Sequence, residues 1–427
     1  MKDLKIVYKV IVIFIIKFTS FIFLYPLAIL VSRSLGAQGY GVYGIVTSGA
    51  ALLMVLATIG SDHMLVKNIA CRYEKGNSPI NKPISVTVTL SAITTLIIIM
   101  ALIISYFLTA DEVWLYILLL IPLMMVRKIL ISITRGMDRS VQAKFSEDIV
   151  QPVVCLLIVS VSYSFWKVEL WVIILALAFS YLVACIYSAY CLRDQWHLLF
   201  SKFNFDEAKY WTILAVPFLG MAISNSIMTY ADRVMLALLH TYSEAGIYLV
   251  AARNASLVMV CFGCMQYIMN PKVASIDSQD NKEVQSIALL HVSLLVFFGT
   301  ISASVLCFFS DFILSLFGEE FGDAKMAMIV LIAFYYIMFF GGAPVQYLFM
   351  IGYEKIGIKI ILTTLFVNLC LNALLIPNFG AVGAATATGV SLIFKTIVGR
   401  IIFFRKTGVY TDLFSILWIR LYKKVTS

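Results

Sequence analysis

Charged residues are scarce in this chain of 427 residues, because Lys, Arg, Asp and Glu together make up only 13% of it. A soluble globular domain averages about 25% charged and about 45–50% apolar residues, whereas 62% of this chain is hydrophobic. Soluble domains of this composition would expose more apolar surface than water tolerates. The composition therefore excludes an ordinary soluble enzyme, a disordered chain, a collagen and a disulfide scaffold. It predicts a protein whose solvent is the lipid bilayer.

Several chemical signatures are also missing. The chain has no Gly-x-x-x-x-Gly-Lys-Ser/Thr loop to hold the phosphates of ATP. Its four histidines are scattered along the chain and form no metal-ligand spacing. Cys261 and Cys264 lie one helical turn apart, but no second pair accompanies them, so packing as small apolar residues is favoured over a metal or redox pair. We therefore predict no metal, no cofactor and no enzymatic activity.

The sequence does contain long apolar runs, and they predict twelve membrane-spanning helices. A helix needs about 20 mainly apolar residues to cross the hydrocarbon core, and these runs lack the apolar/polar alternation of an outer-membrane barrel. The first run has no small-residue cleavage site, so we expect it to be a retained helix rather than a signal peptide. The predicted spans are 9–31, 41–60, 84–108, 113–133, 148–166, 170–191, 211–239, 245–269, 287–309, 325–350, 357–376 and 380–404.

The distribution of basic residues predicts the topology. With the N-terminus placed in the cytoplasm, 20 of the 32 Lys and Arg fall in cytoplasmic segments and two, Arg33 and Lys167, on the opposite side. Because Lys and Arg accumulate in cytoplasmic loops, both termini are predicted to be cytoplasmic. The tail at 405–427 has an apolar face over 410–424, which is typical of an amphipathic helix on the membrane surface; a simple stop-transfer anchor explains it equally well.

The two halves of the chain repeat each other. The first six predicted spans overlap the last six when shifted by 205 positions, and Gly41-Val42-Tyr43 recurs at that offset as Gly246-Ile247-Tyr248. Six spans per half give both halves the same orientation, so we expect a pseudo-two-fold axis along the membrane normal and a central cavity. The predicted fold is an all-α polytopic membrane protein with an N-terminal lobe at 1–209 and a C-terminal lobe at 210–404.

The charges inside the predicted spans are nearly all basic. A charge at mid-membrane costs about 2.5–3.5 kcal/mol, so it is expected to face a wet cavity. Lys17, Arg253 and Lys395 lie deep in their spans and are the main candidates to line one. Asp232 is the one clearly embedded acid, and Asp62 lies at a span edge. The cavity is therefore predicted to be positively charged and to take an anionic guest.

The other embedded bases have blander explanations. Those near span ends can extend to the interface, and Arg233 beside Asp232 is expected to form a local pair, which makes it a weaker candidate. The bases near span ends are Lys9, Arg127, Lys128, Lys325, Lys359 and Arg400. Embedded amides either line a path for sugar hydroxyls or knit helices together, and the sequence leaves both roles open. These amides are Asn225, Asn254, Gln266, Gln346, Asn368 and Asn372.

Four segments in order resemble the polysaccharide-exporter family, the Wzx-type flippases of the multidrug/oligosaccharidyl-lipid/polysaccharide superfamily. The first reads Arg33-Ser-Leu-Gly36-Ala-Gln-Gly39-Tyr-Gly41-Val-Tyr43-Gly44, and the others lie at 231–253, 316–321 and 376–385. Together they cover essentially the whole length of the chain. The resemblance implies two six-helix lobes around a cationic cavity that opens alternately to each side of the bacterial inner (cytoplasmic) membrane.

The resemblance also implies the substrate, an undecaprenyl-diphosphate-linked oligosaccharide repeat unit. The diphosphate needs cations in a site of low dielectric constant, and the polyprenyl tail can stay in membrane lipid. Lys17, Arg253 and Lys395 are then the expected head-group contacts, and Arg33 contacts phosphate at the outer exit or anchors the interface. Polysaccharide polymerase and chain-length machinery are implied as protein partners, whereas no nucleic acid is expected.

The sequence leaves energy coupling and the competing functions open. Coupling to a proton gradient would rest on Asp62 or Asp232, or on the family alone. A multidrug or cation exporter of the same superfamily would need embedded carboxylates. A polysaccharide polymerase or glycosyltransferase would need catalytic carboxylates such as Asp111-Glu112 or Glu319-Glu320, but its usual large outer loop is missing here. A non-transporting scaffold would not need deep bases.

Overall fold

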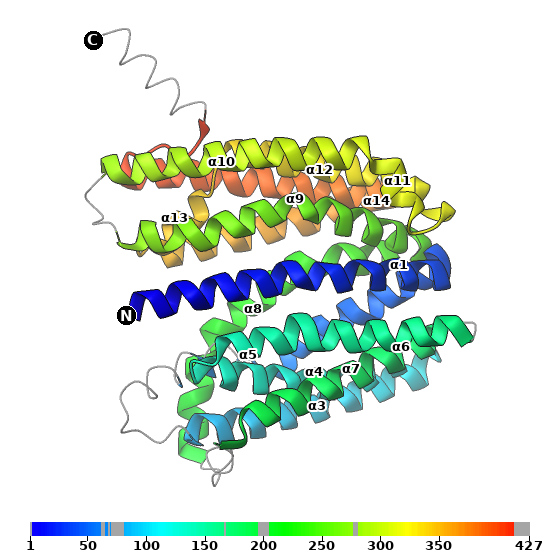
Figure 1. The fold of residues 1–427 in the computed structure, drawn as a ribbon. Coiled ribbons are helices and arrows are strands. Elements are labelled where there is room, and N and C mark those ends of the chain that lie inside the picture. The colour runs from blue at the N-terminus through cyan, green and yellow to red at the C-terminus, as the bar shows by residue number, and fades with distance from the viewer. Residues whose placement is uncertain are drawn as a thin grey trace, which may run out of the picture. The chain divides into compact units, whose positions relative to one another are not determined.

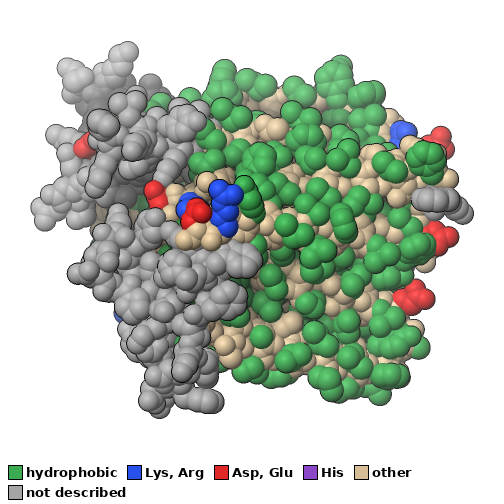
Figure 2. Space-filling view, turned by 60° about the horizontal axis from the view of Figure 1, so that its bottom comes forward, with side chains coloured by type: hydrophobic (Ala, Val, Ile, Leu, Met, Phe, Trp, Pro, Cys, Tyr) green, Lys and Arg blue, Asp and Glu red, His purple; other side chains and the backbone are tan. Residues whose placement is uncertain are grey.

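The chain folds entirely as helices and turns in the residues that the computed structural model describes (Figure 1). These residues are 2–60, 65–66, 69, 81–165, 168–194, 205–275 and 281–413, and for some of them, chiefly in 2–11 and 205–218, the backbone alone is described. Figure 2 shows hydrophobic side chains over most of the described surface in view. Large side chains such as Phe107, Leu108 and Phe308 are about 80% exposed, which suits a protein that meets hydrocarbon instead of water.

Each of the twelve predicted spans falls on a helical segment. The elements are α1 (Lys2–Ala57), α3 (Asn81–Thr109), α4 (Val113–Gly136), α5 (Ser140–Phe145), the π-helix η1 (Ser146–Val150), α6 (Gln151–Phe165), α7 (Leu170–Cys191), α8 (Phe205–Leu239), α9 (Tyr242–Ser275), α10 (Asn281–Phe308), α11 (Ser310–Ser315), the 3₁₀-helix η3 (Glu319–Asp323), α12 (Ala324–Phe340), α13 (Pro344–Met350) and α14 (Glu354–Thr407).

Eight helical segments among the described residues are long and apolar enough to cross a membrane. Two of them, α1 and α14, each contain two predicted spans, because each bends at a glycine: Gly36 has φ 66° and Gly380 has φ 49°. Glycine adopts such positive φ values without the steric cost that a Cβ would add. The predictions at 211–239 and 245–269 correspond to α8 and α9, many of whose side chains lie outside the described set.

The chain divides into two compact units, Met1–Tyr230 and Ala231–Ser427. The boundary between them lies inside α8, whereas the predicted lobe boundary at 209/210 precedes most of that helix. The assignment of 1–209 and 210–404 as lobes, and the pseudo-two-fold axis between them, stay predictions. Each unit contains a buried apolar cluster of its own.

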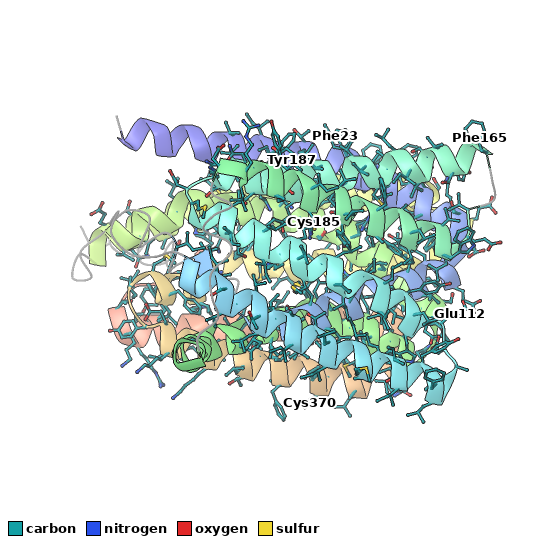
Figure 3. The ribbon with its side chains drawn as sticks, turned by 90° about the horizontal axis from the view of Figure 1, so that it is seen from below. Phe23, Glu112, Phe165, Cys185, Tyr187 and Cys370 are labelled. Atoms are coloured by element: carbon teal, nitrogen blue, oxygen red, sulfur yellow. The ribbon has the colours of Figure 1, made fainter. Side chains whose placement is uncertain are left out.

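Unit 1 is built around α4. This helix packs against α1, α3 and α7, and α6 packs against α7 and α1. One buried cluster fills the end of the unit where α4 finishes; it comprises Leu65, Ile69, Ile84, Met125, Ile129, Ile133, Met137 and Leu192. The opposite end carries the short turns that precede α4 and follow α6, and Figure 3 shows Glu112 and Phe165 there. The helices therefore run antiparallel to their chain neighbours, as short connections require.

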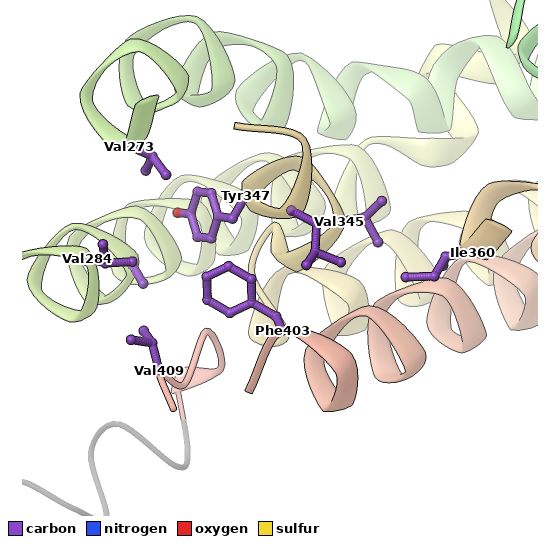
Figure 4. Close-up of a cluster of buried hydrophobic side chains, with 9 residues drawn as sticks. Val273, Val284, Val345, Tyr347, Ile360, Phe403 and Val409 are labelled. Carbon is purple, nitrogen blue, oxygen red and sulfur yellow. The ribbon is translucent and has the colours of Figure 1, made fainter. Parts of the chain in front are cut away.

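Unit 2 is built around α12, which packs against α9, α10 and α14. Its best-defined apolar cluster contains Tyr347 and Phe403, whose ring centroids are 5.8 Å apart (Figure 4). The chain after α14 returns to this cluster. Val409 is buried in it, and the backbone of Tyr410 exchanges two hydrogen bonds with the side chain of Gln285 on α10. Most of the predicted amphipathic tail, from residue 414, lies outside the described residues.

A carboxylate fixes the bend of α14 in unit 2. Glu244, in the first turn of α9, accepts a hydrogen bond from the backbone N–H of Ala381 at 2.6 Å. The helix break at Gly380 leaves that N–H without its usual carbonyl partner, and the carboxylate replaces it. A Cβ built on Gly380 would lie 2.5 Å from Glu244 Oε2. The bend thus requires glycine both for its positive φ and for its close approach to α9.

Replacing Gly380 by alanine should destabilise unit 2. The change strains a positive φ, which costs about 1–2 kcal/mol, and displaces the carboxylate of Glu244. Gly352→Ala is a matched control, since Gly352 also has positive φ but a Cβ added there would meet no neighbouring atom within 4 Å. Thermal unfolding of the detergent-purified protein should show a clearly larger fall in midpoint for Gly380→Ala. Equal falls would refute a role for the Glu244 contact.

Candidate functional site

Asp232 is the centre of a buried polar network in unit 2. It lies on α8 and is only 4% exposed. The hydroxyl of Tyr248 on α9 donates to Asp232 Oδ2 at 2.7 Å, and the hydroxyl of Thr388 on α14 donates to the same oxygen at 2.5 Å. The amide of Asn372, also on α14, donates to Oδ1 at 2.7 Å. Three helices thus converge on one carboxylate.

The network continues along α14. Asn372 also donates to Asn368 Oδ1 at 3.1 Å, and Asn368 donates to Thr388 Oγ1 at 3.5 Å. The bend at Gly380 makes this arrangement available, because it turns the residues after the bend back toward those before it. The two amides therefore link α8 and the two arms of α14 around a carboxylate. Of the two roles that the sequence left open for Asn368 and Asn372, the contacts favour linking helices.

The surroundings of Asp232 give it a switchable charge. Asp232 lies seven residues before the end of α8, about 10 Å along the helix axis. The three neutral donors and the nearby charge of Arg233 favour the ionised carboxylate, whereas burial favours the neutral form. Asn372 Oδ1 is buried and accepts no hydrogen bond within the described residues. An acid with this balance, next to an unused oxygen acceptor, can take up and release a small cation such as a proton or Na⁺.

Unit 1 contains a second charged group, centred on η1. Asp148, whose side chain is 8% exposed, lies 3.5 Å from Lys17 Nζ on α1 and 3.0 Å from Lys144 Nζ on α5. Glu147 lies 3.2 Å from the same Lys144 nitrogen. This corrects the expectation that embedded acids are limited to Asp232 and Asp62, since η1 lies within the candidate membrane span Ser140–Phe165.

The predicted site residues therefore have different environments. Lys17 is about half exposed and paired with Asp148, and its ammonium lies 5.7 Å from the ring centre of Phe21. Arg33, before the α1 bend, is exposed. In unit 2 Arg253 on α9 and Lys395 on α14 are partly buried.

The structure joins few of these predicted residues directly. Arg233 follows Asp232 on α8 and is partly buried, while Asp62 lies outside the described residues. Lys17 and Arg33 belong to unit 1, whereas Arg253 and Lys395 belong to unit 2. Their convergence on one cavity stays a prediction.

The carboxylate pairs of the short loops have local partners. Asp111 Oδ1 accepts a hydrogen bond from the backbone N–H of Val113 at the start of α4, and Glu112 accepts one from Tyr116. Glu319 and Glu320 lie in the first turn of η3. No group of three or more His, Cys, Asp or Glu within the described residues could hold a metal ion. Asp111 and Glu112 thus make contacts at the start of α4.

Sequence reasoning missed several residues of these two groups. Tyr248 stands out in the sequence only as part of the Gly246-Ile247-Tyr248 repeat, and Thr388 is a small polar residue of a type common in membrane helices. Asp148 is the first residue of a predicted span, where the sequence predicts a loop charge, and Lys144 precedes it by one turn. The i, i+4 spacing of Lys144 and Asp148 was the available signal.

Replacing Tyr248 by phenylalanine should weaken unit 2 without filling or emptying space. The change removes one of the three donors to a buried carboxylate, and such interhelical bonds in membranes contribute about 0.6 kcal/mol on average and up to about 1.7 kcal/mol. We expect a lower unfolding midpoint for Tyr248→Phe. Tyr242→Phe, at the more exposed start of α9, should leave the midpoint unchanged; the opposite ranking would contradict the network.

Solved structures show the same fold at low sequence identity. An inward-facing multidrug-resistance MATE-family transporter of the MOP superfamily aligns with a TM-score of 0.72 at 15% identity, covering 92% of this chain and 98% of that one. The lipid II flippase MurJ, in an inward closed conformation, aligns with a TM-score of 0.68 at 15% identity, covering 98% and 93%. A MOP-superfamily transporter from Pyrococcus furiosus aligns at 0.63 and 13% identity, covering 92% and 94%.

Comparison of the sequence with protein families identifies the family. No curated protein matches the chain. The family model described as polysaccharide biosynthesis protein matches residues 6–266, which is more than half of the chain and covers both the η1 group and Asp232. The chain therefore belongs to the polysaccharide biosynthesis protein family, and its fold is similar to that of MOP-superfamily transporters.

Proposed function

We propose that the protein is a flippase for undecaprenyl-diphosphate-linked oligosaccharide repeat units. It moves them from the cytoplasmic to the periplasmic leaflet of the bacterial inner membrane by alternating access, for O-antigen or another surface polysaccharide. The observation that carries the proposal is the family match over residues 6–266. The fold shared with a lipid II flippase supports it, as does the set of embedded bases, which suits a diphosphate.

The bases take the anionic head group in this proposal. Lys17, Arg253 and Lys395 contact the diphosphate during passage, with Arg233 and Arg33 as weaker contacts. A charged group in a medium of low dielectric constant must be paired, so bases that line a polar path hold an anionic guest more tightly than lipid does. The polyprenyl tail stays in the hydrocarbon, where no protein contact is required. The polymerase and chain-length machinery act on the product after it has crossed.

The network of Asp232 couples transport to an ion gradient in this proposal. Its carboxylate takes up a proton or Na⁺ from one side and releases it on the other. The four helices that contribute to or surround it, α8, α9, α12 and α14, then repack around a neutral or charged group. Asp62, outside the described residues, is the second candidate for this role.

One rival function has an observation in its favour. The embedded acids Asp148 and Glu147 join Asp232 in the membrane, and carboxylates are what a multidrug or cation exporter would use. Both acids of η1, however, are already paired with Lys144. A carboxylate neutralised by lysine offers little to a cationic drug. Loss of the gene should therefore leave susceptibility to ethidium unchanged.

The decisive test is a clean deletion of the gene in its own bacterium. Surface polysaccharide should disappear while undecaprenyl-diphosphate-linked repeat units accumulate facing the cytoplasm, because synthesis continues without export. A plasmid copy should restore the wild-type surface. Copies with Lys17, Arg253 or Lys395 changed to Gln should fail to restore it at normal membrane abundance. A deletion strain that keeps its polysaccharide, with no intermediate accumulating, would remove the proposal.

Asp232→Asn should uncouple transport from its ion. The amide keeps the shape of the site and still accepts hydrogen bonds, but it cannot be charged. In inverted vesicles, wild-type uptake of the lipid-linked unit should fall when the pH or Na⁺ gradient is collapsed, and the gradient that matters identifies the ion. The variant should show the same low uptake with and without the gradient. Wild-type uptake that ignores both gradients would exclude coupling.

A further inference from the structure

The charged group around η1 has more positive than negative charge. We call it the η1 cluster and define it by six described residues: Lys17, Arg127, Lys128, Lys144, Glu147 and Asp148. Besides its contact with Lys144, Glu147 lies within electrostatic reach of Arg127 and Lys128 on α4. Four bases therefore accompany two acids, which leaves a surplus of two positive charges shared among three candidate membrane spans.

The π-helix sets the geometry of this cluster. One extra residue per turn rotates the following side chains relative to an α-helix, and such π-helical turns are frequent at functional sites. Ser146 anchors η1 to α7, where its hydroxyl lies 2.8 Å from Ser188 Oγ and donates to the Ala184 carbonyl at 3.1 Å. With that face fixed to α7, Asp148 comes within reach of α1. The Lys17 pair is a consequence of this register.

Asp148 is held by charge more than by hydrogen bonds. Its Oδ2 atom is buried and has no hydrogen-bond partner in the described part of the chain, although Lys144 Nζ lies 3.0 Å away. Lys17 Nζ, at 3.5 Å from Oδ1, is at ion-pair distance. The two lysines hold this carboxylate among the described residues, and another anion can replace it there.

Arg127, a member of the η1 cluster, has buried nitrogen atoms that make no hydrogen bond among the described residues. These atoms are Nε and Nη1, and the guanidinium lies 4.9 Å from the ring centre of Tyr181. Buried donors without acceptors are costly, so an anion that reaches them by a small rearrangement is favoured. Lys17 is 47% exposed and gives an anion access from outside the unit.

We propose that Asp148 is an exchangeable counter-ion, so that the η1 cluster binds one phosphate group together with one proton. The phosphate takes over Lys17 and Lys144, and Arg127 donates to it. The displaced carboxylate accepts a proton from the cytoplasmic water, because a buried carboxylate without a cation becomes neutral. Identifying the phosphate as that of a lipid-linked sugar rests on the proposed function.

Few other titratable groups near Asp148 could account for proton uptake on phosphate binding. Lys17 comes from α1, Lys144 from α5, and Glu147 from η1 itself. From α7, Ala184 and Ser188 contact Ser146, the ring of Tyr187 lies 5.7 Å from that of Phe145, and Tyr181 lies beside Arg127. The chain of α6, Gln151–Phe165, contains no Lys, Arg, Asp, Glu or His.

Binding of geranylgeranyl diphosphate to the full-length protein in phosphatidylcholine nanodiscs tests the proposal. Calorimetry in buffers of different ionisation enthalpy gives both affinity and proton uptake between pH 6.5 and 8. The wild-type protein should take up about one proton more than Asp148→Asn, and its affinity should fall by about tenfold more per pH unit, as linkage requires. The proton uptake of the diphosphate itself is common to both proteins and cancels in this difference.

Two further variants keep the test decisive. Lys144→Gln should weaken binding by about ten- to a hundredfold, since it removes a charge-assisted contact. Asp311→Asn is the matched control, because Asp311 pairs with Lys325 at 2.7 Å but is mostly exposed in unit 2. It should keep the wild-type affinity and pH slope. If Asp148→Asn itself fails to fold, Lys144→Gln must still take up about one proton less than the wild-type protein.

Binding of inorganic diphosphate and of geranylgeraniol, each compared with the prenyl diphosphate, shows which kind of molecule supplies the phosphate. Inorganic diphosphate that binds with the same proton uptake indicates a general phosphate site, and much weaker binding than that of the prenyl diphosphate indicates a lipid-linked ligand. Geranylgeraniol that binds as tightly as its diphosphate would overturn the proposal. Wild-type binding with the same pH slope in Asp148→Asn would overturn the counter-ion exchange and leave the flippase proposal intact. Absence of any diphosphate binding would count against both.

Discussion

Hydrocarbon offers neither hydrogen-bond partners nor hydration to a polar group, and the structure of this protein follows from that constraint. Backbone groups are satisfied by helices that run nearly the full length of each span, and the side chains that face lipid are large and apolar. Where a helix must break, a substitute partner is supplied. The bend of α14 shows this clearly, because Glu244 accepts the backbone N–H of Ala381 beside the break at Gly380. A charge placed in this medium needs either an ionic partner or a group of donors around it.

The two units meet that need in different ways. In unit 2 the carboxylate of Asp232 accepts hydrogen bonds from the neutral donors of Tyr248, Asn372 and Thr388. In unit 1 the acids of η1 are paired with lysines, and the bases outnumber them. The first arrangement suits uptake and release of a small cation, and the second suits exchange of one anion for another. The proposed flippase uses both kinds of group, since its proposed coupling ion and its proposed cargo carry opposite charges.

Much of the fold could be predicted from the sequence, because length and apolarity largely decide where a membrane helix lies. Each predicted span falls on a helix; at the two bends, Gly36 lies between two predicted spans and Gly380 is the first residue of one. Asp232 could be singled out because an acid within an apolar run is rare. Asp148 could not, since it lies at the first residue of its predicted span, where a charge needs no explanation. A π-helix leaves no periodic signature in five residues, so the register that brings Asp148 to Lys17 was hidden as well.

The sequence by itself determined the class of protein and the positions of its helices, because both depend on local composition. Only the tertiary structure decided which polar groups meet. Asn372 and Thr388 are 140 and 156 residues from Asp232, and Lys17 is far from Asp148 along the chain. Contacts at such separations are set by how helices pack and where they bend. The basic residues within apolar runs could therefore be identified from the sequence. The pairing of Lys17 with Asp148 could be identified only from the structure, because it depends on the packing of α1 against η1.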